Sequence, residues 1–92
     1  MKIITNMSNG FNTYAIVYSE EYKKYLAIER KFIKDGKLTE ALSYGSLYPS
    51  DTMEMIIDTI KMEGEIKNIM NERNVTFNEA MLIYSIKIAK FN

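Results

Sequence analysis

Residues 49–73 read PSDTMEMIIDTIKMEGEIKNIMNER, and they carry the clearest helical pattern of the chain. Apolar residues recur there mostly at spacings of three and four, with charged residues on the opposite side. Ser50 or Asp51 can cap the first turn, and Glu54 follows Asp51 at the spacing that a capping box requires. The pattern predicts an amphipathic helix of about 20 residues.

Three segments upstream of this helix are rich in β-branched and aromatic residues, and we expect each to be a strand. Residues 2–7 predict a short edge strand, and residues 11–18 a nearly continuous apolar strand. Residues 22–34 alternate between apolar and polar, as in a half-buried strand. The turn-forming sequence SNG at 8–10 separates the first two segments, so the order along the chain predicts a meander.

The Asp35-Gly36 pair predicts a tight hairpin turn, because both residues tolerate the positive φ angles that such a turn requires. We expect the chain to return from this turn as another strand over residues 38–48, broken or bulged at Gly45.

The C-terminal segment allows two structures. Apolar and polar residues alternate over 82–90, and the segment is rich in β-branched residues, which favours a strand. The alternative is a second helix, because Thr76 and Glu79 have the spacing of a capping box and aromatic and apolar residues follow at helical spacing. The fold class that we predict is α+β: a small antiparallel β-meander of three to five strands packed on one long amphipathic helix, with a C-terminal strand or second helix.

We expect residues 1–92 to form a single domain, since this length supports one core. The residues expected in that core are Ile16, Leu26, Ile28, Phe32, Ile56, Ile60 and Ile69.

Composition excludes most catalytic chemistry. The chain has no His, no Cys and no Trp, so it lacks the usual general base, the usual thiol nucleophile and the common ligands of transition metals. We therefore expect no enzyme activity, no cofactor and no metal. No apolar run suggests a membrane span, and the N-terminus is too polar for a secretory signal, so we expect a cytoplasmic protein without a membrane partner.

A protein-binding surface is the first candidate site. Tyrosines are enriched at the energetic centres of interfaces, and acidic residues one helical turn apart share a face that attracts basic partners. The residues that we expect to contact a partner are Tyr44, Tyr48, Asp51, Glu54 and Asp58. The structural alternative is that the tyrosines belong to the core and that the acids complement the helix dipole or face solvent.

A nucleic-acid-binding face is the second candidate. Lysines interleaved with aromatic residues can hold phosphates while bases stack on the rings. The residues of this face are Lys23, Lys24, Tyr25, Lys31 and Lys34. Twelve basic and twelve acidic residues cancel over the chain, however, so a strong overall attraction to nucleic acid is absent. The structural alternative is that the lysines protect sheet edges.

In its general style, this Lys-, Ile- and Asn-rich small α+β chain resembles accessory proteins of phages and mobile elements, although no specific motif carries the resemblance. Such proteins commonly inhibit or redirect a host protein, anti-CRISPR proteins among them, by occluding a surface. The resemblance implies a non-enzymatic inhibitor in the cytoplasm of a host cell. Its partner would be a host protein that is basic or handles nucleic acid, and a homodimer is left open.

Overall fold

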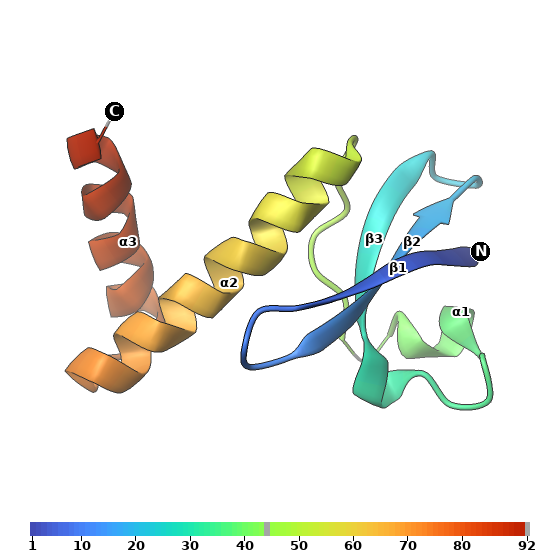
Figure 1. Ribbon diagram of the computed structural model, residues 1–92, viewed down its shortest axis with the longest axis horizontal. Coiled ribbons are helices and arrows are strands. Elements are labelled where there is room, and N and C mark those ends of the chain that lie inside the picture. The colour runs from blue at the N-terminus through green and yellow to red at the C-terminus, as the bar shows by residue number, and fades with distance from the viewer. Residues whose placement is uncertain (44, 92) are drawn as a thin grey trace. The chain divides into compact units, whose positions relative to one another are not determined.

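The computed structural model describes residues 1–43 and 45–91, without the side chains of residues 90 and 91. Contacts divide the chain into two compact units, Met1–Lys61 and Met62–Asn92, with the boundary inside the long helix (Figure 1). The expectation of a single domain stays a prediction.

The first unit contains a three-stranded antiparallel sheet. Its strands are β1 (Lys2–Ser8), β2 (Thr13–Ser19) and β3 (Lys24–Glu29), in the spatial order β1-β2-β3 (Figure 1). Consecutive strands are neighbours, so the predicted meander is confirmed.

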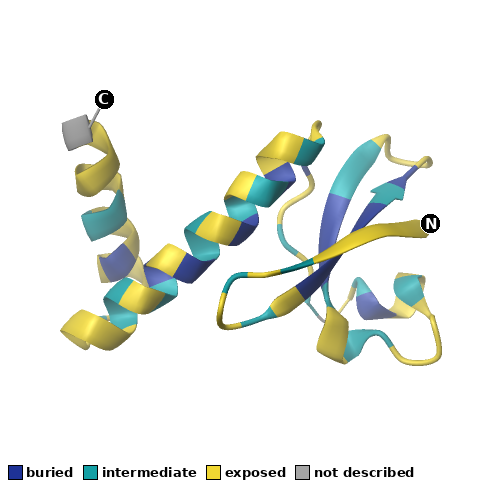
Figure 2. Cartoon of the chain, in the orientation of Figure 1, coloured by how far each residue is buried: buried dark blue, intermediate teal, exposed yellow. Residues whose placement is uncertain are grey.

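The middle of β2 and β3 is buried on both faces of the sheet, which explains why β2 is almost continuously apolar. On one face, Ile16 pairs with Ala27 and packs in a cluster with Ile56 and Ile60 of the long helix. On the other face, Val17 and its neighbours form a second cluster. The buried members of that cluster are Val17, Leu26, Ile28 and Ala41. Figure 2 shows this buried centre in β2 and β3, whereas β1 is exposed along most of its length.

The strand predicted over residues 38–48 is wrong. A short 3-10 helix, η1 (Arg30–Phe32), follows β3, and a short α-helix, α1 (Leu38–Ala41), follows the Asp-Gly turn. Asp35 and Gly36 do adopt the expected positive φ angles, 54° and 71°, but their turn leads into α1 and not into a hairpin. The reason is that Leu38, Ala41 and Leu42 have helical spacing and pack together against the second cluster.

Residues 45–50 run along the outer edge of β3. Leu47 donates its backbone N–H to the carbonyl of Ala27 at 2.9 Å, and Ser50 and Tyr25 exchange two backbone hydrogen bonds of 2.8 and 3.0 Å. These contacts are isolated bridges and do not form a strand. Gly45 is required here because a Cβ atom at this position would collide with the ring of Phe32. The outer edge of β3 is therefore covered by the chain itself.

The predicted long helix is confirmed as α2 (Met53–Arg73), which has 21 residues. Its predicted cap is wrong, because the hydroxyl of Thr52 accepts the N–H of Met55 at 3.1 Å and so caps the first turn. Asp51 instead forms an ion pair with Lys24.

The second unit contains the C-terminal part of α2 and a further helix, α3 (Phe77–Phe91). The strand favoured over residues 82–90 is wrong, and the alternative helix is correct. Thr76 and Glu79 form the capping box: each donates its backbone N–H to the other's side chain, both at 3.2 Å. Asn74, with a φ of 50°, lies in the turn between the two helices.

Five of the seven core residues predicted from sequence are buried: Ile16, Leu26, Ile28, Ile56 and Ile60. Phe32 and Ile69 are half-buried. Four further residues of β2 and β3, which were not among the expected core residues, are fully buried because both faces are covered there: Tyr14, Ala15, Val17 and Ala27. No helix within the described residues has both the length and the apolar character needed to cross a membrane.

Candidate protein-binding surface

The most exposed aromatic side chains of the described residues lie in the first unit. Tyr48 is 86% exposed and Tyr22 is 66% exposed. Both line one hollow, although they are far apart in the sequence. The other residues that line this hollow are Lys24, Leu26 and Pro49. We call this hollow and its two tyrosines the tyrosine surface.

The two tyrosines come together because residues 45–50 pair with β3. Tyr22 belongs to the turn between β2 and β3, and Tyr48 lies between two residues whose backbones bond to β3. Leu47 bonds to Ala27 and Ser50 bonds to Tyr25, so the main chain on both sides of Tyr48 is fixed. A partner would therefore need to order only the tyrosine side chain, which has two rotatable torsions.

Acidic residues continue from the tyrosine surface onto the first turns of α2. Asp51, Glu54 and Asp58 are all exposed, and Glu54 and Asp58 share one helix face because they are four residues apart. The charge of Asp51 is compensated by Lys24, whereas neither Glu54 nor Asp58 forms an ion pair with any other residue that the structure describes. Within the described ranges, no three acidic side chains converge in a way that could hold a metal ion.

Of the five predicted partner-contact residues, Tyr48 lines the hollow and Asp51 pairs with Lys24 of its lining, whereas Glu54 and Asp58 lie on the first turns of α2. Tyr44 lies outside the described residues, so its position relative to Tyr48 is not given. Tyr22 is the residue that sequence reasoning did not assign to this surface. Its one local signal is that this aromatic residue directly follows the polar link Ser19-Glu20-Glu21, where a core position is not expected, and that signal does not point to Tyr48.

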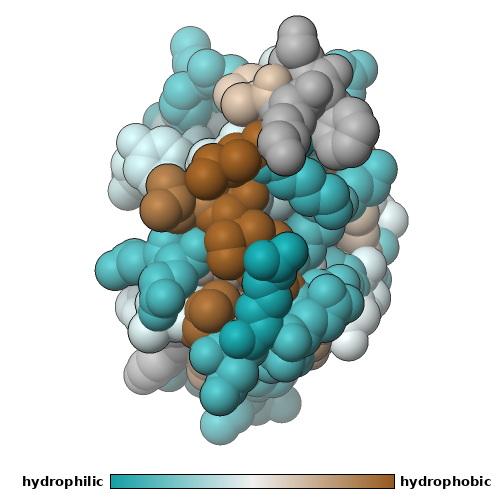
Figure 3. Space-filling view, turned by 90° about the vertical axis from the view of Figure 1, so that its left-hand side faces the viewer, coloured by the Kyte–Doolittle hydropathy of each residue, from teal (hydrophilic) through white to brown (hydrophobic). Residues whose placement is uncertain are grey.

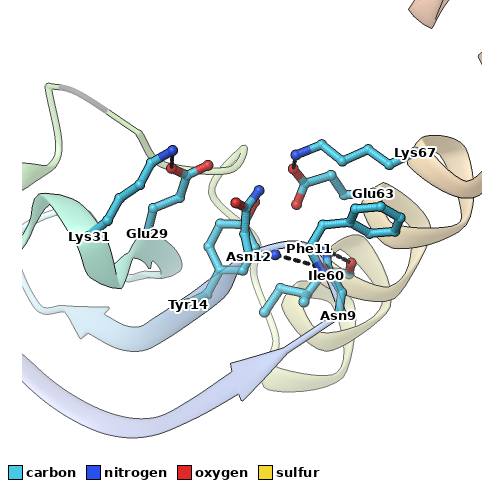
Figure 4. Close-up of polar contacts among 9 residues, drawn as sticks. All are labelled: Asn9, Phe11, Asn12, Tyr14, Glu29, Lys31, Ile60, Glu63 and Lys67. Carbon is cyan, nitrogen blue, oxygen red and sulfur yellow. Dashed lines mark hydrogen bonds and ion pairs between the residues drawn. The ribbon is translucent and has the colours of Figure 1, made fainter. Parts of the chain in front are cut away.

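The lysines of the predicted nucleic-acid face are spread along the length of β3. Lys23 and Lys24 lie at the start of β3, whereas Lys31 and Lys34 lie beyond its end, and a six-residue strand spans roughly 20 Å. Lys31 forms an ion pair of 3.3 Å with Glu29 (Figure 4), and its ammonium group lies 5.1 Å from the centre of the Phe32 ring.

Tyr25 is half-buried and packs against the core cluster of Ile16 and Ile56. Its ring centre lies 4.9 Å from that of Tyr18, with the two rings tilted by 53°. A base that stacked on Tyr25 would have to displace the contacts of its ring with Tyr18 and with the core cluster.

Comparisons with known proteins do not assign this chain to a family. No protein-family model matches the chain, and no curated protein and no solved structure matches it significantly.

Proposed function

We propose that this chain is a small, non-enzymatic protein-binding module that acts in the cytoplasm, and that its partner binds at the tyrosine surface. The observation that carries the proposal is that Tyr22 and Tyr48, from separate segments, line one hollow and expose most of their area. Aromatic side chains beside a hollow are typical of the centre of a protein interface.

The tyrosines supply contact area, and the neighbouring acids select the partner. Tyr48 offers a large apolar ring with a hydroxyl that can bond to a partner, and its main chain is already held. Glu54 and Asp58 add negative charge beside it, which accelerates association with a basic surface. A basic partner that handles nucleic acid fits this combination.

In keeping with the resemblance to phage and mobile-element accessory proteins, we propose that the partner is a host protein and that binding occludes its surface. A defence protein of the CRISPR type is one candidate. The alternative function is direct binding of nucleic acid through Lys23, Lys24 and their companions. It has less support, because those lysines are dispersed and two of them form ion pairs.

A pull-down with the whole chain tests which class of partner is bound. Tagged protein is incubated with lysate of a candidate host, with and without nuclease, and captured proteins are identified by mass spectrometry. A specific protein that is retained after nuclease treatment supports the proposal. Capture of nucleic acid, with every protein lost after nuclease treatment, contradicts it and favours the alternative.

A further inference from the structure

Asn9 is followed by Gly10, and this is the one Asn-Gly pair in the chain. Asparagine is a thermally labile residue, and it is most labile before glycine, because glycine has no Cβ atom to hinder attack by its own backbone nitrogen. The pair lies in the turn between β1 and β2, where the Asn9 side chain is half-buried. Asn9 is therefore the asparagine of this chain whose neighbour most favours deamidation.

Deamidation of an Asn-Gly pair proceeds through a five-membered ring. The backbone nitrogen of Gly10 loses its proton to solvent and attacks Cγ of Asn9, and the Nδ2 atom takes up a proton and leaves as ammonia. Water then opens the ring at one of its two carbonyl groups. One product is aspartate. The other is isoaspartate, in which the main chain runs through Cβ and Cγ and is longer by one carbon atom.

Both nitrogen atoms that take part in this reaction are hydrogen-bonded in the folded chain. The N–H of Gly10 donates to the hydroxyl of Ser8 at 3.2 Å. The Nδ2 atom of Asn9 donates to the backbone carbonyl of Ile60 in α2 at 2.9 Å (Figure 4). Ring closure removes the proton from the first donor and the nitrogen atom of the second. It therefore breaks both hydrogen bonds.

The carbonyl end of the Asn9 side chain is held as well. Its Oδ1 atom accepts the backbone N–H groups of Phe11 and Asn12, both at 3.0 Å. The amide group is thus fixed at both ends, and it loses the free rotation by which an unfolded chain brings Cγ onto the Gly10 nitrogen. The folded turn therefore opposes the reaction that its sequence favours.

The products cannot restore the bond to α2. Aspartate at position 9 keeps oxygen atoms for the N–H groups of Phe11 and Asn12, but it has no donor for the carbonyl of Ile60, and it brings a negative charge towards that oxygen. Isoaspartate also lengthens the main chain inside a turn that is closed by the backbone hydrogen bond from Asn9 to Asn12, of 3.2 Å.

We propose that Asn9 is a site of spontaneous deamidation that the folded turn protects, and that a chain which reacts while unfolded folds back without the bond between this turn and α2. Ammonia is lost in the reaction, so the change is not reversed and it accumulates in chains that have been unfolded. The inference concerns the first unit alone and does not depend on the function proposed above.

The rates of deamidation in the folded and the unfolded chain test the protection. The wild type is incubated at mildly alkaline pH, in buffer and in guanidinium chloride, and the exchange of NH2 for OH is located by mass spectrometry after trypsin digestion. Residues 3–23 form one tryptic peptide, which also contains Asn6 and Asn12 as controls, because each of these is followed by a residue with a Cβ atom. Both samples are kept dilute, because α3 exposes large apolar side chains (Figure 3), which favour association between chains.

We expect Asn9 to react in guanidinium chloride and to react at least about tenfold more slowly in buffer, because two hydrogen bonds have to break first. Asn6 and Asn12 should react far more slowly than Asn9 in the denaturant. Equal rates for Asn9 in buffer and denaturant would overturn the proposal, and so would an Asn9 that is as slow as the two controls in the unfolded chain.

The variant Asn9→Asp tests the consequence of the reaction, because it keeps the acceptor atoms and removes the donor to Ile60. Its thermal midpoint should lie below that of Asn6→Asp, which adds the same charge to the exposed strand β1. Equal midpoints for the two variants would overturn this half of the proposal. The rates measured on the wild type test the other half even where Asn9→Asp does not fold.

Discussion

The side-chain amide of Asn9 donates a hydrogen bond of 2.9 Å to the backbone carbonyl of Ile60, across 51 residues of sequence (Figure 4). The same side chain accepts the backbone N–H groups of Phe11 and Asn12, both at 3.0 Å, with its Oδ1 atom. Asn9 therefore shapes the turn between β1 and β2 and also fastens that turn to α2, so that one residue links the two layers of the first unit.

We expect Asn9→Ala to lower the free energy of unfolding by about 1–3 kcal/mol, because it removes three hydrogen bonds from one position. Urea unfolding followed by circular dichroism measures the change. The matched control is Asn6→Ala in the exposed strand β1, which should change the stability by less than about 0.5 kcal/mol. Equal effects of the two substitutions would contradict the role given to Asn9.

Ile60 is fully buried in the cluster that joins α2 to the sheet. Ile60→Ala should lower the stability by about 2–4 kcal/mol, because it removes buried methyl groups and leaves a cavity. Met55→Ala in the same helix is the control, since Met55 is half exposed, and its cost should be below about 1 kcal/mol. Thermal unfolding of both variants checks the assignment of the buried helix face.

Gly45→Ala should destabilise the first unit by about 1–3 kcal/mol, because the new methyl group collides with the Phe32 ring. Phe32→Leu in the same chain removes part of the ring and should recover some of this loss. The double-mutant cycle, measured by chemical unfolding, gives the coupling between the two positions. Strictly additive effects would mean that the two residues are not in contact.

Thr76→Ala should loosen the start of α3, with a cost of about 1 kcal/mol, because the hydroxyl that accepts the Glu79 N–H is lost. Hydrogen exchange of the Glu79 amide should become faster. Glu79→Gln is the matched control, because glutamine can also close a capping box, and it should change the exchange much less. Unchanged exchange of the Glu79 amide in Thr76→Ala would contradict the role given to the Thr76 hydroxyl.

The sequence was sufficient for the elements whose signals are local. The alternation and turns of residues 2–34 predicted the meander, and the spacing of apolar residues from Met53 predicted α2. The prediction for residues 38–48 was wrong because two signals compete there. The Asp-Gly pair favours a hairpin, whereas three apolar residues have helical spacing. Packing of these apolar residues against the sheet favours the helix. In α3, β-branched residues favoured a strand, but the Thr76–Glu79 capping box favoured a helix, and the helix formed.

The candidate site was predictable only in part. Tyr48 and the acids of α2 are close in sequence, so they could be grouped before the structure was known. Tyr22 could not be assigned to this surface from the sequence, because it lies beside the same hollow as Tyr48 only through the pairing of residues 45–50 with β3. The predicted hairpin at Asp35-Gly36 would bring residues 38–48 back along the preceding strand, but the pairing that forms consists of isolated bridges in an irregular segment. The dispersion of the lysines likewise follows from the position of η1 and the loop after it.

The central claim, that the tyrosine surface binds a protein partner, is tested most directly by quantitative capture from nuclease-treated host lysate. The variant Tyr22→Ala/Tyr48→Ala is compared with the wild type and with Phe11→Ala, which removes an exposed aromatic ring from another turn of the same unit. We predict that the double tyrosine variant captures at least about tenfold less of the partner, while Phe11→Ala captures as much as the wild type. Equal capture by all three proteins would contradict the claim.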